Sequence, residues 1–267
     1  MQETRFFWGV YDAISAAVVD EAGGQGLWLS SLCCSAACGL PDSDLVGLGD
    51  LLGCIRAIRR ATSLPLWIDC GTGFGSAANL AVAAHDLRLA GADAVCVEDK
   101  VFPKRNTFTA VSQPLEDVDR FGEKIARAKA ALAGSSCLVI ARTEALAFGE
   151  PLEMALHRAA RYAEAGADAL LLSNPSTSAA STFEFLVAWG GRLPVVLIPT
   201  SYCLDNPAEL PALGVSVAIY ANQLLRASVT AMGHLLESFR ADHASVTRHE
   251  EMISVPELLR LTDKRLL

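Results

Sequence analysis

The chain has 267 residues, 52% of them hydrophobic, and its formal net charge is −8 at pH 7. This length suits one large α/β domain, and the acidity argues against a broad nucleic-acid surface. Its apolar runs stay well short of the roughly 18 residues of a membrane span. The start, "MQETRFFWGV", lacks the features of a signal peptide. We therefore expect a cytoplasmic protein that binds neither nucleic acid nor membrane.

Apolar runs bounded by glycine, proline or charged residues predict eight strands. In chain order these runs lie within 6–10, 26–32, 64–70, 90–99, 137–143, 165–174, 193–199 and 215–221. Helical patterns fill most of the intervals, at 12–23, 44–61, 76–90, 115–133, 151–165 and 222–240. Two of the strands follow the same sequence, "AGAD", which is typical of a helix that ends in glycine before a buried strand. The segments 182–190 and 206–213 give no clear pattern.

Eight alternations of strand and helix in this length predict a (β/α)8 TIM-type barrel rather than an open sheet. The sequence contains no linker or change of composition that indicates a second domain. We expect the barrel to cover residues 1–240, with residues 241–267 as a C-terminal helical extension of the same domain.

No two of the eight cysteines form a CxxC motif. In a chain of this length they predict reduced thiols, mostly small core residues, rather than a disulfide scaffold. A zinc site built on Cys34 and Cys38 is the alternative. The sequence lacks a second pair of ligands for it, so we disfavour zinc.

Polar side chains follow most of the predicted strands, where a barrel collects its chemistry. These residues are Ser30, Ser31, Asp69, Glu98, Asp99, Arg142, Glu144, Ser173, Asn174 and Asn222. Asp69 and Glu98 end neighbouring strands, and two carboxylates at one strand spacing suit a hard cation such as Mg²⁺. The alternative is that both acids bond to loop amides or pair with Lys100 or Lys104. Spacing alone favours the metal only slightly.

Arg142 ends a buried strand, where its planar guanidinium suits a carboxylate or phosphoryl group. A structural salt bridge to Glu144 is a serious alternative. The glycine-rich "CGTGFG" at 70–75 departs from dinucleotide-binding spacing and predicts a tight turn instead. The five histidines fall in predicted helices or in the C-terminal tail, so none is a candidate for the catalytic base.

Several longer blocks together resemble the phosphoenolpyruvate mutase branch of the isocitrate lyase superfamily. They are "GVYDAISA" at 9–16, "GLPDSD" at 39–44, "EDKVFPKRNT" at 98–107, "ARTEAL" at 141–146, "IPTSY" at 198–202, "ANQLLRASV" at 221–229 and "SVPELLRL" at 254–261. The block at 98–107 is the most specific, and the resemblance implies that it is a gating loop. It also implies a barrel whose eighth helix is exchanged with a neighbouring subunit in a homodimer or homotetramer.

The resemblance further implies the roles of individual residues. Mg²⁺ would be held by Asp69 and Glu98, with the carboxylate of Asp42 farther out. The substrate carboxylate would bind Ser30 and the backbone amides of Ser31 and Leu32, and Trp28 would line the pocket. The phosphoryl group would contact Arg142, Asn106 and Thr107, while Lys104 would act in the closed loop and Ser173 would lie near the substrate.

The implied function is a Mg²⁺-dependent phosphonomutase, which interconverts the small molecules phosphoenolpyruvate and phosphonopyruvate and so forms a carbon–phosphorus bond. Asn106 supports the mutase, because the lyases of the superfamily resemble "KRCGH" where this chain has "KRNTF". An amide also cannot deprotonate water. A hydrolase or carbon–carbon lyase acting on a related 2-oxo acid is the alternative, and a non-catalytic barrel is a third hypothesis.

Two positions depart from the family pattern. Gly71 stands where the family usually has a second aspartate, and Ser173 stands where it usually has a histidine. We expect these changes to remove a negative charge and to open space near the substrate. One hypothesis is therefore a variant substrate, an enolpyruvate with a modified phosphoryl group or an arsenic analogue. Sequence drift compensated by water is an equally weighted alternative.

Overall fold

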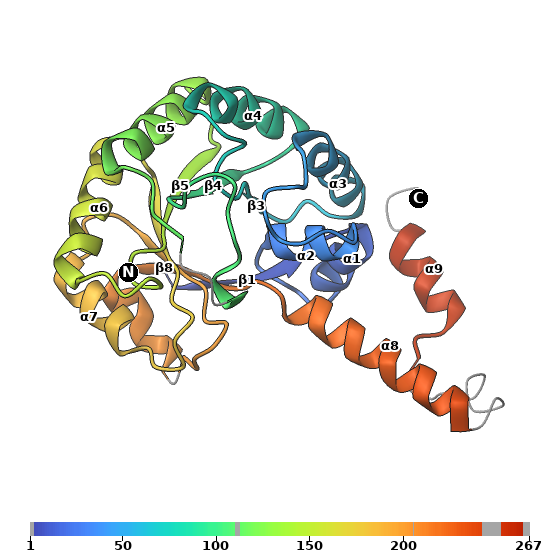
Figure 1. The fold of residues 1–267 in the computed structure, drawn as a ribbon. Helices are drawn as coiled ribbons and strands as arrows, with labels where there is room; N and C mark the ends of the chain where they lie inside the picture. The colour runs from blue at the N-terminus through green and yellow to red at the C-terminus, as the bar shows by residue number, and fades with distance from the viewer. Residues whose placement is uncertain (1–2, 110–112, 205, 242–251, 264–267) are drawn as a thin grey trace.

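The computed structural model describes residues 3–109, 113–204, 206–241 and 252–263. Within these residues, parallel strands close into a barrel in which each strand pairs with the next and the last returns to the first (Figure 1). The strands are β1 (Arg5–Val10), β2 (Leu27–Leu29), β3 (Leu66–Asp69), β4 (Ala94–Glu98), β5 (Leu138–Thr143), β6 (Ala169–Leu172), β7 (Val195–Leu197) and β8 (Val215–Tyr220). The predicted (β/α)8 barrel is confirmed.

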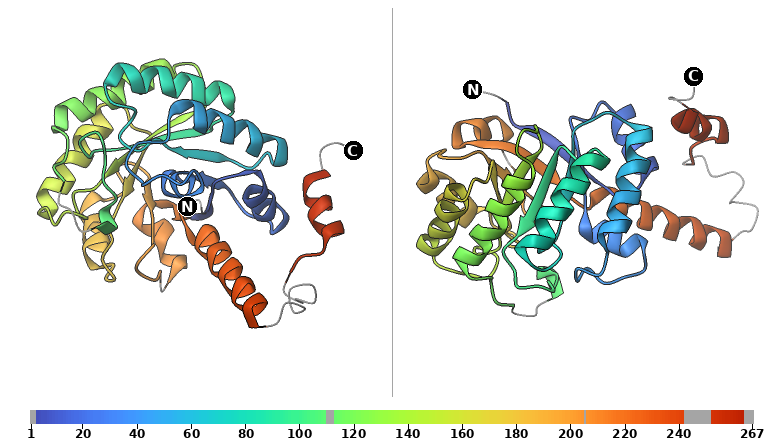
Figure 2. Two further views of the ribbon diagram at one scale, coloured as in Figure 1. Left: turned by 45° about the vertical axis from the view of Figure 1, so that its right-hand side comes forward. Right: turned by 90° about the horizontal axis from the view of Figure 1, so that it is seen from above.

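Helices follow the strands along the chain, and most of them surround the barrel on its outer face (Figures 1 and 2). They are α1 (Ala13–Glu21), α2 (Ser31–Ala37), α3 (Leu48–Ala61), α4 (Ala77–Ala90), α5 (Val118–Ala131), α6 (Leu152–Glu164), α7 (Ala180–Trp189), α8 (Gln223–Ala241) and α9 (Val255–Asp263). Two short 3₁₀ helices, η1 (Thr107–Thr109) and η2 (Pro207–Leu213), lie in the connections. The two segments without a clear sequence pattern thus hold α7 and η2.

The predicted strand at 26–32 is wrong at its end. The strand stops at Leu29, because the hydroxyl of Ser30 accepts a hydrogen bond from the backbone amide of Cys33 and caps α2. Ser31 and Leu32 therefore belong to the first turn of a helix. Their backbone amides are among those that a helix leaves without an intrahelical partner.

The barrel has a packed interior. Side chains that include Phe7, Trp28, Trp67 and Ile140 fill it, and a larger cluster fills the layer between strands and helices. Both faces of the strands are thus buried, which explains why their sequences are continuous apolar runs. A filled interior leaves the carboxyl ends of the strands as the place for a site.

The repeated "AGAD" sequences form the same corner twice. Gly91 and Gly166 adopt left-handed φ angles of 113° and 99° directly after α4 and α6. The following aspartates, Asp93 and Asp168, each accept a hydrogen bond from a backbone amide of the preceding strand, at 2.7 and 2.8 Å. Each corner therefore ends a helix and anchors two neighbouring strands.

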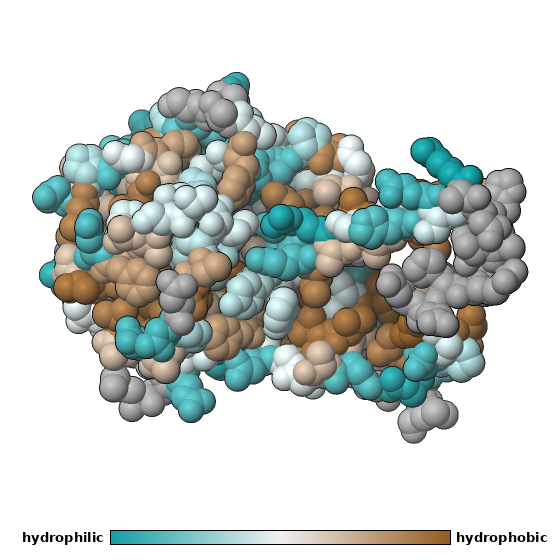
Figure 3. Space-filling view, turned by 90° about the horizontal axis from the view of Figure 1, so that it is seen from below, coloured by the Kyte–Doolittle hydropathy of each residue, from teal (hydrophilic) through white to brown (hydrophobic). Residues whose placement is uncertain are grey.

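The last two helices differ from the others. α8 starts beside β1 and projects away from the barrel, while α9 lies near α1, where Arg260 pairs with Glu21 at 2.8 Å (Figures 1 and 2). Hydrophobic side chains, coloured brown, are visible in Figure 3 on the part of the molecule that projects from the barrel, which α8 forms. The extension proposed for 241–267 is described only over 252–263. In the part of the chain that is described, the helices are too short or too polar to cross a membrane.

The cysteines are free thiols, most of them buried. Cys34 is buried and Cys38 is exposed. Across the described ranges, His, Cys, Asp and Glu side chains do not form a group of three or more that could hold a metal ion.

Candidate active site

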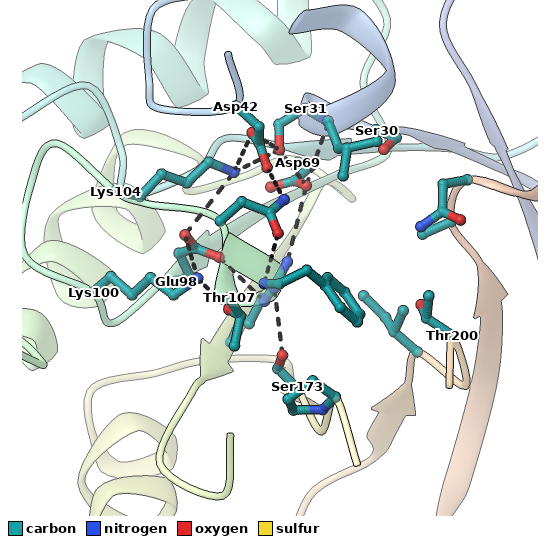
Figure 4. Close-up of a pocket in the computed structure, with 18 of the residues that line it drawn as sticks. Ser30, Ser31, Asp42, Asp69, Glu98, Lys100, Lys104, Thr107, Ser173 and Thr200 are labelled. Carbon is teal, nitrogen blue, oxygen red and sulfur yellow. Dashed lines mark hydrogen bonds and ion pairs between the residues drawn. The ribbon is translucent and has the colours of Figure 1, made fainter. Parts of the chain in front are cut away.

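A small pocket of about 70 Å³ opens at the carboxyl ends of the strands (Figure 4). The structure brings every residue to which the family resemblance assigned a role to this one pocket, whereas Asp99 and Glu144 do not line it. The residues brought together are Trp28, Ser30, Ser31, Leu32, Asp42, Asp69, Glu98, Lys104, Asn106, Thr107, Arg142 and Ser173. Lys100, Phe108, Asn174, Pro175, Ile198, Thr200, Ala221 and Asn222 complete the lining.

Strand register places the acids beside the arginine. Asp69 is the last residue of β3 and Glu98 the last of β4, and Glu98 pairs in register with Arg142 of β5. Because parallel strands end at one edge of the barrel, residues far apart in the sequence meet there.

Glu98 is the most deeply buried acid of the pocket lining, with an exposed fraction of 1%. Among the residues that the structure describes, neither carboxylate oxygen has a hydrogen-bond partner. The nearest cationic groups are Arg142 Nε at 3.3 Å, Lys100 Nζ at 3.6 Å and Lys104 Nζ at 4.0 Å. Burial alone would raise the pKa of Glu98, but these three cations outweigh it and lower the pKa to about 2. Glu98 is therefore a charged carboxylate with unused acceptor capacity.

Asp69 faces the same space and is better satisfied. Its Oδ2 accepts a hydrogen bond from Ser31 Oγ at 2.8 Å, and its Oδ1 accepts one from the amide of Gly71 at 3.1 Å. With Glu98, it gives two carboxylates rather than a full set of protein ligands. That donor set fits Mg²⁺, which keeps several waters and takes further oxygens from its substrate.

Arg142 pairs with Glu144, as its sequence position suggested, and also contacts Ser173. Its Nε donates to Glu144 Oε1 at 2.6 Å, and its Nη2 donates to Ser173 Oγ at 3.5 Å. Burial would lower the pKa of Arg142, but Glu144, Glu98 and Asp69 raise it well above its ordinary value. The salt bridge to Glu144 thus keeps the Arg142 guanidinium charged and in place at the pocket.

The segment from Lys100 to Thr109 lies over the pocket. Lys104 Nζ donates to Ser31 Oγ at 2.7 Å and pairs with Asp42 Oδ1 at 3.0 Å, as Figure 4 shows. The amide group of Asn106 donates to Asp42 Oδ2 at 2.6 Å. Asp42 therefore joins two residues of this segment to the pocket, which is the arrangement expected of a closed loop.

Lys104 is itself nearly inaccessible, with an exposed fraction of 3%. Burial would lower the pKa of its ammonium group, but Glu98, Asp69 and Asp42 raise it. A buried lysine that stays charged is a fixed cation for an anionic ligand.

Sequence interpretation gave Lys100 only the role of a pairing partner for the acids. It is 2% exposed, donates to Thr107 Oγ1 at 2.8 Å and pairs with both Glu98 and Glu144. The hydroxyl of Thr107 in turn donates to Glu144 Oε2 at 3.0 Å. The signal was present in the sequence, because Lys100 follows the end of a buried strand by only two residues.

Asp44 is a second residue that sequence interpretation missed. Its carboxylate lies beside Gly71, where an added Cβ would come within 2.1 Å of Asp44 Oδ1. Asp44 thus places a carboxylate beside the turn in which Gly71 itself carries none. The expected effect of Gly71 on the substrate stays a prediction. Ser173, by contrast, only reaches Arg142 at the limit of hydrogen-bond distance.

Residues 2–240 match the family model described as phosphoenolpyruvate phosphomutase. The phosphoenolpyruvate phosphomutase of Streptomyces hygroscopicus is 36% identical over 256 residues, which are 96% of this chain and 82% of that protein.

Solved structures agree with the sequence comparison. The phosphoenolpyruvate phosphomutase of Streptomyces platensis subsp. rosaceus superposes with a TM-score of 0.94 at 36% identity, covering 99% of this chain and 92% of that one. A phosphonopyruvate hydrolase bound to oxalate and Mg²⁺ superposes with a TM-score of 0.91 at 34% identity, covering 98% and 92%. Similarity of sequence and fold thus does not separate a mutase from a hydrolase.

Proposed function

This chain belongs to the phosphoenolpyruvate phosphomutase family of enzymes, and we propose that it interconverts phosphoenolpyruvate and phosphonopyruvate with the help of Mg²⁺. The observation that carries the proposal is the buried Glu98 carboxylate next to Asp69 and Arg142, whose oxygens have no hydrogen-bond partner within the described part of the chain. The lining has three acids and three cations, namely Asp42, Asp69, Glu98, Lys100, Lys104 and Arg142. A substrate with a carboxylate and a phosphoryl group therefore needs a further cation.

Asp69 and Glu98 would hold Mg²⁺, directly or through water. When bound, the ion would neutralise charge and polarise substrate oxygens. Ser30 and the first backbone amides of α2, from Ser31 and Leu32, would hold the substrate carboxylate, against the indole of Trp28.

Arg142 and Thr107 would hold the phosphoryl oxygens while the group moves between oxygen and carbon 3. Little covalent chemistry is required of the protein, because a loose phosphoryl transition state is stabilised mainly by positioning and charge. Arg142 is fixed for this role by Glu144, and its guanidinium stays charged at every accessible pH.

Asn106 supports the mutase over the hydrolase. Its amide is oriented by Asp42 and can hold a phosphoryl oxygen, but it cannot take a proton from water. Closure of Lys104 and its neighbours over the pocket would exclude water that otherwise captures the phosphoryl group. The transfer would then stay within one molecule.

The test is phosphorus NMR of the purified protein with Mg²⁺ and phosphonopyruvate. The mutase predicts a new phosphoenolpyruvate signal that disappears when the metal is chelated. Inorganic phosphate as the main product would instead establish the hydrolase, which the 34% identical structure makes the second candidate. Assays with related 2-oxo acids would reveal a carbon–carbon lyase through a split carbon skeleton.

A variant oxyanion substrate is a further candidate, because the small side chain of Ser173, rather than a histidine, lies beside Arg142 in the pocket. It predicts that phosphonopyruvate stays unchanged in the NMR experiment while calorimetry still detects Mg²⁺ binding. Ser173→His would then lower activity on the modified enolpyruvate and raise it on phosphonopyruvate. Gly71→Asp is unsuitable for this comparison, since its side chain would collide with Asp44.

A further inference from the structure

One carboxylate joins three separate segments at the mouth of the pocket. Asp44 lies in the connection before α3 with a left-handed φ of 55°. Its Oδ2 accepts hydrogen bonds from the backbone amide of Lys104 at 2.8 Å and from Thr72 Oγ1 at 2.7 Å. Its Oδ1 lies 3.4 Å from the amide of Thr72. Asp44 thereby ties the turn after β3 to the segment that covers the pocket.

This carboxylate fits only because residue 71 has no side chain. An ideal Cβ at Gly71 would lie 2.1 Å from Asp44 Oδ1 and 3.6 Å from Lys104 Cε. The first distance is far below any contact between real atoms, and the Asp44 side chain is held too firmly by its partners to yield without losing them. Gly71 and Asp44 therefore form a matched pair, in which the glycine makes room for the acid.

The backbone amide that Asp44 holds belongs to Lys104, whose side chain enters the pocket. The ammonium group of Lys104 reaches Ser31, Asp42 and Glu98 inside the pocket. To keep these contacts, the long side chain of Lys104 must stay in one conformation, which costs entropy. A fixed backbone holds the start of the side chain in place and so favours that conformation.

We propose that Asp44 is a positioning residue that holds the segment Lys100–Thr107 closed and thereby sets the ammonium group of Lys104 over the substrate. The expected effect of Asp44 on turnover rests on the proposed phosphonomutase function. The effect of Asp44 on the segment itself does not, because its contacts are with other residues of the protein. The two levels can therefore be tested separately.

The first experiment is hydrogen–deuterium exchange of the substrate-free protein, followed on peptides that contain Lys104. Asp44→Ala removes the acceptor, and Gly71→Ala displaces it while leaving Asp44 in place. Both are expected to speed exchange about tenfold or more, as loss of a charged hydrogen bond would. Asp44→Asn keeps an oxygen acceptor and should preserve most of the protection.

Gly190→Ala is the matched control for strain. Gly190 has a φ of 62°, close to the 54° of Gly71, but nothing lies within 4 Å of its ideal Cβ. It should therefore carry the same backbone cost without changing exchange at Lys104. Equal protection of Lys104 in Asp44→Ala and the wild type would overturn the proposal.

The second experiment measures KM and kcat for phosphonopyruvate in the same variants. Asp44→Ala and Gly71→Ala should each raise KM about tenfold, and the double variant should be no worse than either, because both changes remove one contact. Additive effects would contradict the pairing of Gly71 with Asp44. If the wild type does not act on phosphonopyruvate, the proposed function fails, while the exchange experiment still decides the role of Asp44.

Discussion

At the scale of single residues, the pocket depends on cations that its own acids hold in place. Arg142 is the clearest case, since Glu144 and Glu98 lie within 3.3 Å of its Nε and orient its planar group. A lysine at this position would keep the charge but lose the forked geometry.

We predict that Arg142→Lys lowers kcat by about 100-fold, the usual effect of removing a group that stabilises transition-state charge. Thermal stability should change little by comparison. Arg59→Lys is the control: Arg59 bonds to Gly91 and Asp93 at the corner after α4, away from the pocket. That variant should lower the melting temperature and leave kcat unchanged. The prediction fails if Arg142→Lys keeps wild-type turnover.

Asp99, next to Glu98, makes stability depend on pH. It is fully buried and accepts hydrogen bonds from Thr143, Tyr162 and the amide of Glu144. Burial raises the pKa of Asp99 from its ordinary 3.8 to about 6, although these hydrogen bonds lower it. Between these values the folded chain binds more protons at Asp99 than the unfolded chain. Its contribution to stability is therefore lost as pH rises from about 4 to about 6.

We predict that the wild type loses up to about 3 kcal/mol of unfolding free energy between pH 4 and pH 7, measured as its difference from Asp99→Asn. Urea unfolding of both proteins at intermediate pH values measures this difference. The subtraction is needed because Glu98, whose pKa is lowered to about 2, gives the opposite trend below its ordinary pKa. Parallel pH curves for the two proteins would contradict the assignment.

Which residues could be predicted follows from where they lie. Asp69, Glu98 and Arg142 end strands, and the barrel rule alone brings strand ends together. Asp44 and the inward course of Lys100 depend on loop conformation, which neighbouring backbone amides fix and local sequence does not encode. Gly71 could be interpreted only as a missing acid until the position of Asp44 was known.

At the scale of elements, the segment over the pocket is held from two sides. Asp44 contacts it from the connection before α3, and Gln113 contacts it from beyond η1. The side-chain oxygen of Gln113 accepts from the amide of Arg105 at 2.6 Å, and its amide group donates to the carbonyl of Pro103 at 2.9 Å. The sequence predicted a loop here, but this support depends on two residues meeting across an irregular backbone.

We predict that Gln113→Ala increases the fraction of phosphonopyruvate converted to inorganic phosphate, because a loosened segment admits water. An increase of about fivefold in the phosphate to phosphoenolpyruvate ratio would match loss of one or two hydrogen bonds. Phosphorus NMR measures both products together. Gln25→Ala is a suitable control, since Gln25 also accepts a backbone hydrogen bond, from Phe6, at the other end of the barrel. An unchanged ratio in Gln113→Ala would argue against this role.

At the scale of the whole molecule, α8 leaves apolar surface that the described residues of one chain do not cover. Val229, Met232, Leu236 and Phe239 on this helix are 44% to 63% exposed. Contiguous exposure of this kind marks an interaction surface. We propose that a second copy of the chain covers it by exchange of α8, as its resemblance to the family implies.

We predict that the wild type is a dimer or tetramer by light scattering, and that Leu236→Glu reduces it to a smaller species. Leu89→Glu is the matched control, since Leu89 on α4 is equally exposed at 63% but lies on the outer ring of the barrel. It should leave the mass unchanged. A wild-type monomer would refute the proposal.

The two "AGAD" corners stabilise the end of the barrel that lies opposite the pocket. Arg59 binds Asp93 at one corner and Lys129 binds Asp168 at the other, both at 2.5 Å and both at the amino-terminal ends of strands. Folding is thus secured at the end of the barrel opposite the pocket. Evolution could therefore change the residues that recognise the substrate while the ion pairs at the opposite end of the barrel stayed intact. Changes such as Ser173 in the pocket and Gly71 beside Asp44 can therefore alter the chemistry without loss of the ion pairs that hold the barrel together.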